Sequence, residues 1–188
     1  MNIHFVTKNR HKVSEATAVL GKYGIRVVQV KKEKDESKDD DIVKTAKKNA
    51  LMFAKMLKKP VVVEDTGFFY DDYKDFPGSH PKLMYKSLGY KGLLKLLEGS
   101  KKRGAEFRCC LTYSDGKSVK AFIGNLRGRI TKKVYGKRCD VMPYERIFIP
   151  ENHNRALVYM GREEKNRISH RAKAFMKLGD YLCRLKQH

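Results

Sequence analysis

Short runs of β-branched residues alternate with amphipathic segments along most of the chain. The runs at 3–6, 25–30 and 61–65 are apolar and of strand length, and the segments between them repeat apolar residues at helical spacing. This alternation is typical of domains in which helices cover a central sheet. The sequence therefore predicts an α/β fold, with VVVED at 61–65 as a buried strand that ends in two acids.

The remaining elements follow from the same periodicities. Helices are expected over 10–22, 43–57 and 82–98, and at the C-terminus around Phe175, Leu178, Leu182 and Leu185. Paired strands are expected over 105–113 and 117–130, around the hairpin signal Ser114-Asp115-Gly116, with a short strand at 146–150. Since no repeat or linker divides the chain, we expect a single domain over residues 1–188.

The charge balance is unusual. Of the 188 residues, 42 are Lys or Arg and 21 are Asp or Glu, which gives a net charge of +21. Such a field favours polyanionic partners, namely nucleotides, nucleic acids or an anionic membrane. It is equally compatible with a solvated basic surface, so composition alone does not choose among these.

Other features of the composition exclude several classes of protein. No apolar run approaches the roughly 20 residues that a membrane-spanning helix needs. The start, MNIHFVTKNR, does not resemble a signal peptide, so we expect a cytoplasmic protein. The four cysteines form no C-x-x-C pair, which favours reduced thiols over a zinc site or a disulfide framework.

Cationic residues crowd the first strand-to-helix junction. Thr7 or Asn9 is expected to cap the helix, and the neighbouring cations are Lys8, Arg10, His11 and Lys12. Cations are disfavoured at a helix N-terminus by roughly 0.3–1 kcal/mol each when exposed, and a bound anion would reverse that cost. This junction is either a phosphate-binding site or merely a basic first turn.

The same pattern recurs near the C-terminus. Ser169 is a good N-cap, and His170 and Arg171 occupy the first helical positions that follow it, with Lys165 just upstream. Capping explains Ser169 but does not explain the two cations. We therefore expect His170 and Arg171 to contact a ligand.

Glu64 and Asp65 supply the opposite charge. Ligands bind at the carboxyl ends of strands in open α/β sheets, and Gly67 is expected to turn the chain or to allow close approach of a ligand. Adjacent strand residues face opposite ways, so only one of the two acids should point into a given cleft. With Glu36 from the charged loop at 31–41, they could hold Mg²⁺ against bound phosphates. Taken singly, they could equally be solvated acids paired with lysines.

Together these segments resemble the inosine triphosphate pyrophosphatase family over nearly the whole chain. FVTKNRHKVSEA is similar to the entry segment T-G-N-x-x-K-x-x-E, and VEDTGFF with the later FPG resembles the acid-acid-S/T-G run and its Pro-Gly loop. PYERIFIP is similar to the segment that begins with an aromatic residue and Asp, and EEKNRISHRAKAF matches the signature E-K-N-x-x-S-H-R.

The resemblance implies an elongated mixed central sheet flanked by helices, with two lobes around a nucleotide cleft, in a homodimer. It also implies hydrolysis of ITP, dITP and XTP to a monophosphate and pyrophosphate with Mg²⁺. In its terms Asp65 is the catalytic base or metal-linked carboxylate, with Glu64 beside it and Glu36 as a second metal ligand. The residues implied to bind substrate are Thr7, Asn9, Lys12, Thr66, Gly67, Met142, Tyr144, Glu145, Lys165, His170 and Arg171.

The chain departs from the family pattern at several positions. Lys8 stands where glycine is usual, Leu51 replaces a helix lysine, and Met142 and Glu145 replace an aromatic residue and Asp. A related nucleotide pyrophosphatase with altered base specificity is therefore one alternative. Another is a family member that has lost turnover and binds nucleic acid through its basic surface, which we do not favour because no array of aromatic stacking residues accompanies the charge.

Overall fold

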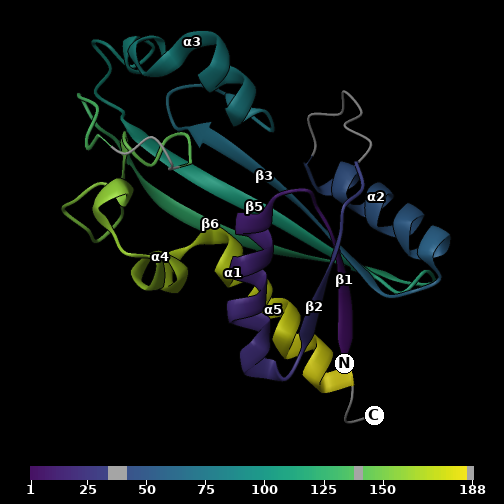
Figure 1. Cartoon of the computed structure of the whole chain (residues 1–188). Helices are drawn as coiled ribbons and strands as arrows, with labels where there is room; N and C mark the ends of the chain where they lie inside the picture. The colour runs from purple at the N-terminus through teal and green to yellow at the C-terminus, as the bar shows by residue number, and fades with distance from the viewer. Residues whose placement is uncertain (34–41, 138–141, 186–188) are drawn as a thin grey trace. The chain divides into compact units, whose positions relative to one another are not determined.

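The computed structural model describes residues 1–33, 42–137 and 142–185, in which helices flank a mixed sheet (Figure 1). The strands are β1 (Asn2–Val6), β2 (Arg26–Val30), β3 (Val61–Tyr70), β4 (Pro77–Gly78), β5 (Gly104–Ser114), β6 (Val119–Ile130) and β7 (Phe148–Pro150). The α-helices are α1 (Arg10–Leu20), α2 (Ile42–Leu57), α3 (Pro81–Lys95), α4 (Arg162–Ile168) and α5 (His170–Leu185).

The sheet combines parallel and antiparallel neighbours. Its order is β2-β1-β3-β5-β6-β7, and β4 pairs with β3. β1 runs parallel to both β2 and β3, so that Phe5 lies opposite Gln29 on one side and Val62 on the other. The pairs β3–β4 and β6–β7 are antiparallel. This arrangement confirms the predicted α/β class with a mixed central sheet.

The chain divides into two compact units. Unit 1 comprises Met1–Thr66, Cys109–Gly124 and Ser169–His188, and unit 2 comprises Gly67–Arg108 and Asn125–Ile168. Each unit is assembled from segments that are distant in the sequence, and β3, β5 and β6 contribute residues to both. The prediction of a single domain stays a prediction.

The length of β3 corrects one expectation about the two acids. Pairing with β1 ends at Val63, just before the two acids at which the strand was expected to finish. Antiparallel pairing of Phe68 and Phe69 with β4 keeps the chain extended as far as Tyr70. Glu64 and Asp65 therefore lie in the middle of β3, immediately beyond its β1-paired part, and not at its carboxyl end.

Gly67 is likewise inside β3 and does not turn the chain. A Cβ at this position would lie 2.6 Å from the ring of Phe69 and 3.1 Å from the carbonyl oxygen of Gly78. Both contacts are shorter than normal van der Waals separation, so a side chain here would require the Phe69 ring or the backbone of Gly78 to shift. The glycine thus allows close packing within unit 2.

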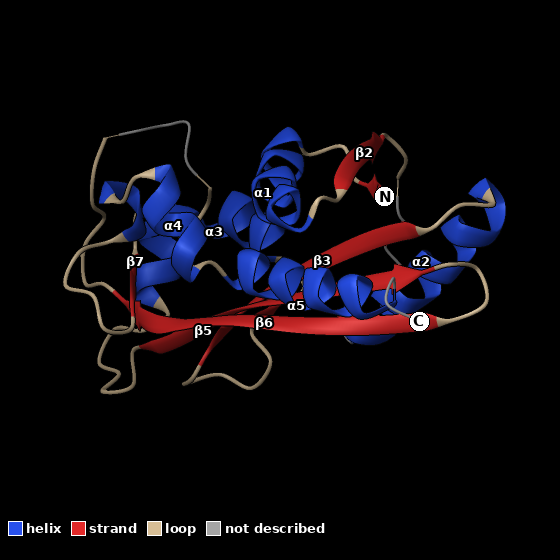
Figure 2. Ribbon diagram, turned by 90° about the horizontal axis from the view of Figure 1, so that it is seen from below, coloured by secondary structure: helices blue, strands red, loops and turns tan. Residues whose placement is uncertain are grey.

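In unit 1, helices cover both faces of the sheet. α1 and α5 lie side by side (Figure 2) on the face that carries Cys109. On this face Phe5 and Phe175 meet edge to face, with their ring centroids 5.5 Å apart. α2 packs against the opposite face, where Ala46 contacts Cys110. Because adjacent strand residues point to opposite faces, Cys109 of β5 faces α1 and α5, and Cys110 faces α2.

Unit 2 has a core rich in aromatic residues. Phe68 lies 4.4 Å from Tyr144 and 4.3 Å from Phe107, measured between ring centroids, and Leu93 and Leu97 complete the packing. Both ring pairs are tilted, with interplanar angles of 45° for Phe68–Phe107 and 44° for Phe68–Tyr144.

Two helical features differ from the sequence-based expectation. α3 is interrupted at Gly89, whose φ of 58° and ψ of −174° are not helical, because glycine tolerates a backbone conformation that other residues avoid. The short helix α4 precedes Ser169 and was not predicted. By contrast, the boundaries of α2 and the start of α5 agree with the predictions.

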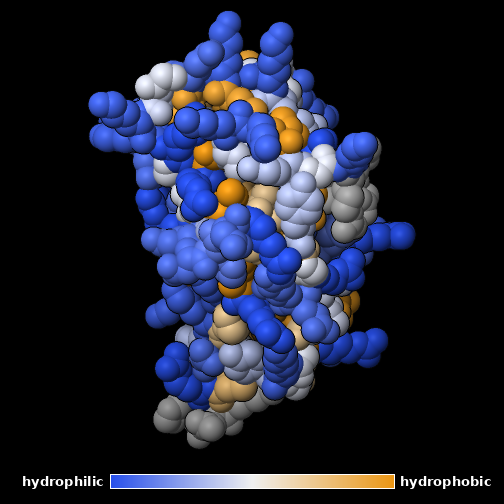
Figure 3. Space-filling model, turned by 90° about the vertical axis from the view of Figure 1, so that its left-hand side faces the viewer, coloured by the Kyte–Doolittle hydropathy of each residue, from blue (hydrophilic) through white to orange (hydrophobic). Residues whose placement is uncertain are grey.

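On the face shown in Figure 3, hydrophilic side chains prevail and hydrophobic ones form small groups. Over the residues that the structure describes, no helix is long and apolar enough to cross a membrane.

Candidate functional site

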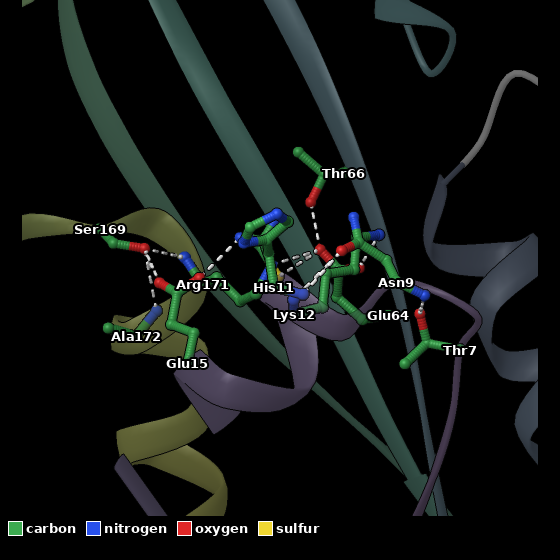
Figure 4. Close-up of polar contacts among 11 residues, drawn as sticks. Thr7, Asn9, His11, Lys12, Glu15, Glu64, Thr66, Ser169, Arg171 and Ala172 are labelled. Atoms are coloured by element: carbon green, nitrogen blue, oxygen red, sulfur yellow. Dashed lines mark hydrogen bonds and ion pairs between the residues drawn. The ribbon is translucent and has the colours of Figure 1, made fainter. Parts of the chain in front are cut away.

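Glu64 is at the centre of a buried network of polar contacts in unit 1 (Figure 4). Its side chain has no exposed surface, and Oε2 accepts from Lys12 Nζ. Oε1 accepts from Thr66 Oγ1, from Arg171 Nε at 3.1 Å and from Cys109 Sγ at 3.6 Å. A buried carboxylate is costly unless it is paired and hydrogen-bonded, and here it is both. Four of the predicted site residues therefore converge.

Arg171 connects this carboxylate to a second one. Its Nη1 donates to Glu15 Oε2 at 2.7 Å while its Nε donates to Glu64. Burial by itself lowers the pKa of Arg171, and the Glu64 and Glu15 carboxylates more than reverse this, so the pKa lies above that of a free guanidinium. With Lys12, the group contains two cations and two anions and is electrically balanced.

The start of α5 is capped as predicted. Ser169 Oγ accepts from the backbone N–H of Arg171 at 3.1 Å and of Ala172 at 3.2 Å. The same hydroxyl donates to Glu15 Oε1. The cap therefore joins the helix start to the ion-pair network and holds the Arg171 backbone within it.

The start of α1 resolves the choice between two capping residues. Asn9 is the N-cap, and its Oδ1 accepts from the backbone N–H of His11 at 2.9 Å and of Lys12 at 3.4 Å. Thr7 instead accepts from the N–H of Asn9 at 3.1 Å, which stiffens the loop ahead of the helix. Lys8 forms an exposed ion pair with Glu33, and that pair lowers the pKa of Glu33.

Asp65 leaves β3 on the face opposite to Glu64, as the alternation along a strand requires. It is half-buried, and together with Glu64 it raises the pKa of Cys110, which burial chiefly brings to about 11. Lys47 of α2 acts on the same thiol in the opposite direction. Asp65 and Lys47 therefore both lie near Cys110. α2 thus brings a lysine to this region although position 51 carries leucine.

Of the two predicted Mg²⁺ ligands, Asp65 is among the residues that the structure describes and Glu36 lies outside them. Among the residues that the structure describes, no three His, Cys, Asp or Glu side chains form a group that could hold a metal by themselves. Mg²⁺ is usually bound by one or two carboxylates together with substrate phosphates. A half-buried carboxylate such as Asp65 supplies the oxygen donors that Mg²⁺ prefers, so the donor chemistry fits.

His170 is half-buried at the start of α5 and both of its ring nitrogens are buried, so that desolvation first and then the charge of Arg171 hold its pKa well below the usual value. The imidazole is therefore neutral at pH 7, with one donor and one acceptor nitrogen. Gly124 of β6 allows the sheet to approach this turn, because a Cβ there would lie 2.0 Å from the carbonyl oxygen of His170.

Unit 2 contains the other predicted residues. Lys165 Nζ lies 2.5 Å from Glu145 Oε2, and both side chains are mostly buried. Met142 is 43% exposed, whereas Tyr144 is 1% exposed and donates its hydroxyl to the carbonyl of Pro81 at 3.1 Å. Tyr144 is thus a core residue in this structure, while Met142 has the accessible surface that a ligand contact needs. Their predicted contacts with substrate stay predictions.

Glu15 is the member of the network that the sequence-based prediction missed. It lies three residues after Lys12 on α1, so both side chains project from one face of the helix. That spacing was visible in K-V-S-E, but its partners are 154 and 156 residues away.

This chain resembles known proteins over nearly its whole length. A family model described as the Ham1 family matches residues 3–181. A protein of Saccharolobus solfataricus named dITP/XTP pyrophosphatase is 36% identical over 182 residues, which cover 97% of this chain and 94% of the relative. One of the same name from Pyrobaculum aerophilum is 38% identical over 182 residues, with 97% and 96% covered.

Solved structures support the fold. The structure of a HAM1 protein from Coxiella burnetii superposes with a TM-score of 0.82 at 23% identity, covering 98% of this chain and 99% of the other. The Staphylococcus aureus Ham1 protein gives a TM-score of 0.79 at 21% identity, with 97% and 98% covered. At these identities the likeness concerns the fold alone.

Proposed function

This chain belongs to the Ham1 family, and from that premise we propose that it hydrolyses ITP, dITP and XTP to the nucleoside monophosphate and pyrophosphate. The relatives from Saccharolobus solfataricus and Pyrobaculum aerophilum, matched over nearly their full lengths, are named dITP/XTP pyrophosphatases. The resemblance of the sequence motifs to the inosine triphosphate pyrophosphatase family points to the same chemistry.

The observation that carries the proposal is the placement of Glu64 and Asp65. Glu64 is enclosed by Lys12, Arg171 and Thr66, so its oxygens are already used as acceptors. A carboxylate in that position is poorly suited to accept a proton from water. Asp65 points to the other face of β3 and is half-buried, which suits a general base.

In the proposed reaction, Asp65 orients a water molecule and accepts its proton as the water oxygen attacks the α-phosphorus. The new bond joins this oxygen to phosphorus, and the bond from the α-phosphorus to the bridging oxygen breaks, releasing pyrophosphate. Mg²⁺, when bound through Asp65 and the phosphates, would neutralise charge on the phosphate oxygens. Thr7, the N-cap Asn9 and Lys12 are proposed to hold the phosphate chain so that the α-phosphorus faces the attacking water.

Base selection would depend on groups that distinguish a 6-keto purine from adenine. His170 is neutral and can donate one hydrogen bond to an acceptor such as O6. A site arranged to donate to a keto oxygen leaves an amino group badly paired, and such mismatches are discriminated strongly. In unit 2, the Glu145–Lys165 ion pair provides a further set of polar groups proposed to serve in base recognition.

The test is pyrophosphate release from ITP, dITP, XTP, GTP, ATP and modified deoxynucleotides, each measured with Mg²⁺ and again with excess EDTA. We expect turnover of the inosine and xanthosine nucleotides with Mg²⁺, and loss of turnover with EDTA. A preference for ATP or GTP would contradict the proposed substrates while leaving the reaction intact. Absence of turnover with every nucleotide, together with salt-sensitive RNA binding, would contradict the proposal that this protein hydrolyses nucleotides.

Assembly is a separate part of the proposal. The resemblance implies a homodimer, and sedimentation velocity at micromolar concentration would measure a species of about twice 21.8 kDa if this holds. A single species at the monomer mass would contradict it without affecting the proposed chemistry.

A further inference from the structure

Glu15 joins two segments of unit 1 that are far apart in the sequence. From the second turn of α1, its Oε1 accepts from Ser169 Oγ and its Oε2 accepts from Arg171 Nη1 at 2.7 Å. The Glu15 side chain is 13% exposed and that of Arg171 is 11% exposed, so water competes little for these contacts. Both carboxylate oxygens are thus used to hold the first turn of α5.

The contact differs from an ordinary ion pair because Arg171 already has a carboxylate partner. Glu64 accepts from Nε, on one side of the guanidinium, and Glu15 accepts from Nη1 at another position of the planar fork. A single acceptor leaves the plane free to swing about that contact. Two acceptors at different nitrogens define both the position and the orientation of the plane.

The network also separates the roles of the two carboxylates. Glu64 is shared among Lys12, Thr66, Cys109 and Arg171, whereas Glu15 pairs with Ser169 and Arg171, both at the start of α5. Removal of the Glu15 charge would therefore act on Arg171 and on the helix cap while leaving the Lys12–Glu64 pair in place.

We propose that Glu15 is a positioning residue, which orients the Arg171 guanidinium and the first turn of α5 for nucleotide binding without itself touching the substrate. This inference rests on the proposed function, in which Arg171 contacts the nucleotide. In it Glu15, the acid of the K-x-x-E segment, acts through the side chain of Arg171.

The kinetic test compares Glu15→Gln, which removes the charge at nearly constant shape, with Glu15→Asp, which keeps the charge on a shorter side chain. Glu151→Gln is the control, because Glu151 is an exposed glutamate outside the network. With ITP and Mg²⁺ we expect Glu15→Gln to lower kcat/KM at least tenfold, chiefly through KM. Glu15→Asp should recover part of this loss, and Glu151→Gln should leave kcat/KM unchanged.

Coupling to Arg171 distinguishes positioning from general structural support. Lysine at 171 keeps the charge but lacks the planar fork, so Glu15→Gln added to Arg171→Lys should lower kcat/KM less than threefold further. A full tenfold loss in that background would mean that the two residues act independently and would overturn the proposal. Unchanged kcat/KM in Glu15→Gln alone would overturn it as well.

A spectroscopic measurement tests the same idea without turnover. In ¹⁵N-labelled protein, the Arg171 Nε–H resonance, assigned by its loss in Arg171→Lys, should shift and exchange faster with water in Glu15→Gln. An unchanged resonance would overturn the positioning role even in an active enzyme. If the wild-type protein hydrolyses no nucleotide, the proposed function fails, and this resonance still decides whether Glu15 orients Arg171.

Discussion

Glu64 and Asp65 are neighbours in β3 whose side chains leave the strand on opposite faces. Glu64 is fully buried against α1 and α5, where Lys12 and Arg171 pair with it, and Asp65 is half-buried on the face that carries Cys110. The alternation of side chains along the strand thus separates a carboxylate that is paired with two cations from the carboxylate that is proposed to act as the general base. Their substitutions should consequently have different effects.

Asp65→Asn should abolish turnover and leave the fold largely intact, because the change is nearly isosteric and the side chain is half-buried. Loss of a general base typically lowers the rate by roughly 10²–10⁴-fold. Steady-state pyrophosphate release with ITP would measure the rate, and urea unfolding would measure the stability. Asp72→Asn, at an exposed position of unit 2, is the matched control and should retain activity. Wild-type activity in Asp65→Asn would remove Asp65 from its proposed role.

Glu64→Ala should act first on stability. It would leave Lys12 and Arg171 buried without their shared carboxylate, and breaking a buried pair in this way typically costs about 3–5 kcal/mol. The free energy of unfolding in urea measures the effect. Glu33→Ala removes a glutamate whose pair with Lys8 is exposed, and it should leave the unfolding midpoint unchanged. Equal midpoints for both variants would show that the Glu64 network contributes nothing to stability.

The sequence motifs predicted which residues gather in unit 1 better than how they interact. Ser169 was recognisable as a cap, and Asn9 as one of two candidates with Thr7, because capping is a local property of a few consecutive residues. The cations after each cap were singled out because charge of this sign is unusual at a helix start. Two of them, Lys12 and Arg171, belong to the Glu64 network, and their expected contact with a ligand stays a prediction.

The partners of Arg171 were not predictable in the same way. Its contact with Glu15 depends on how α1 packs against α5, which joins residues 156 positions apart. The length of β3 posed a similar problem, because whether the strand continues past Asp65 depends on its pairing with β4. In both cases the deciding interactions are between elements that no local pattern connects.

Gly124→Ala should disturb the start of α5 from the side of the sheet, because Gly124 lies on β6. The added Cβ would lie 2.0 Å from the carbonyl oxygen of His170 and 2.7 Å from the backbone nitrogen of Ala174, so sheet and helix must separate. Overpacking of this kind typically costs about 1–3 kcal/mol. We expect a lower melting temperature and a raised KM for ITP. Gly21→Ala, where nothing lies within 4 Å of the added Cβ and φ is −57°, should show neither effect.

The imidazole of His170 should make stability depend on pH. Its folded-state pKa is held well below the ordinary value by burial and by Arg171 and Lys12, against the opposing effect of Glu64. The unfolded chain, with a histidine pKa of about 6.5, therefore binds more protons than the folded chain as the pH falls below that value. Stability should be constant from this source above pH 7 and should decline from about pH 6.5 towards the lower folded-state pKa.

Urea unfolding between pH 5 and pH 8 measures this decline, with His170→Asn as the comparison. The variant has no imidazole at this position, so its stability should fall less steeply below pH 6.5 than that of the wild-type protein. His153→Asn is the control, because His153 belongs to unit 2 and is not a member of the Glu64 network, and its profile should follow the wild type. Identical profiles for the wild type and His170→Asn would show that His170 is protonated as easily in the folded protein as in the unfolded chain.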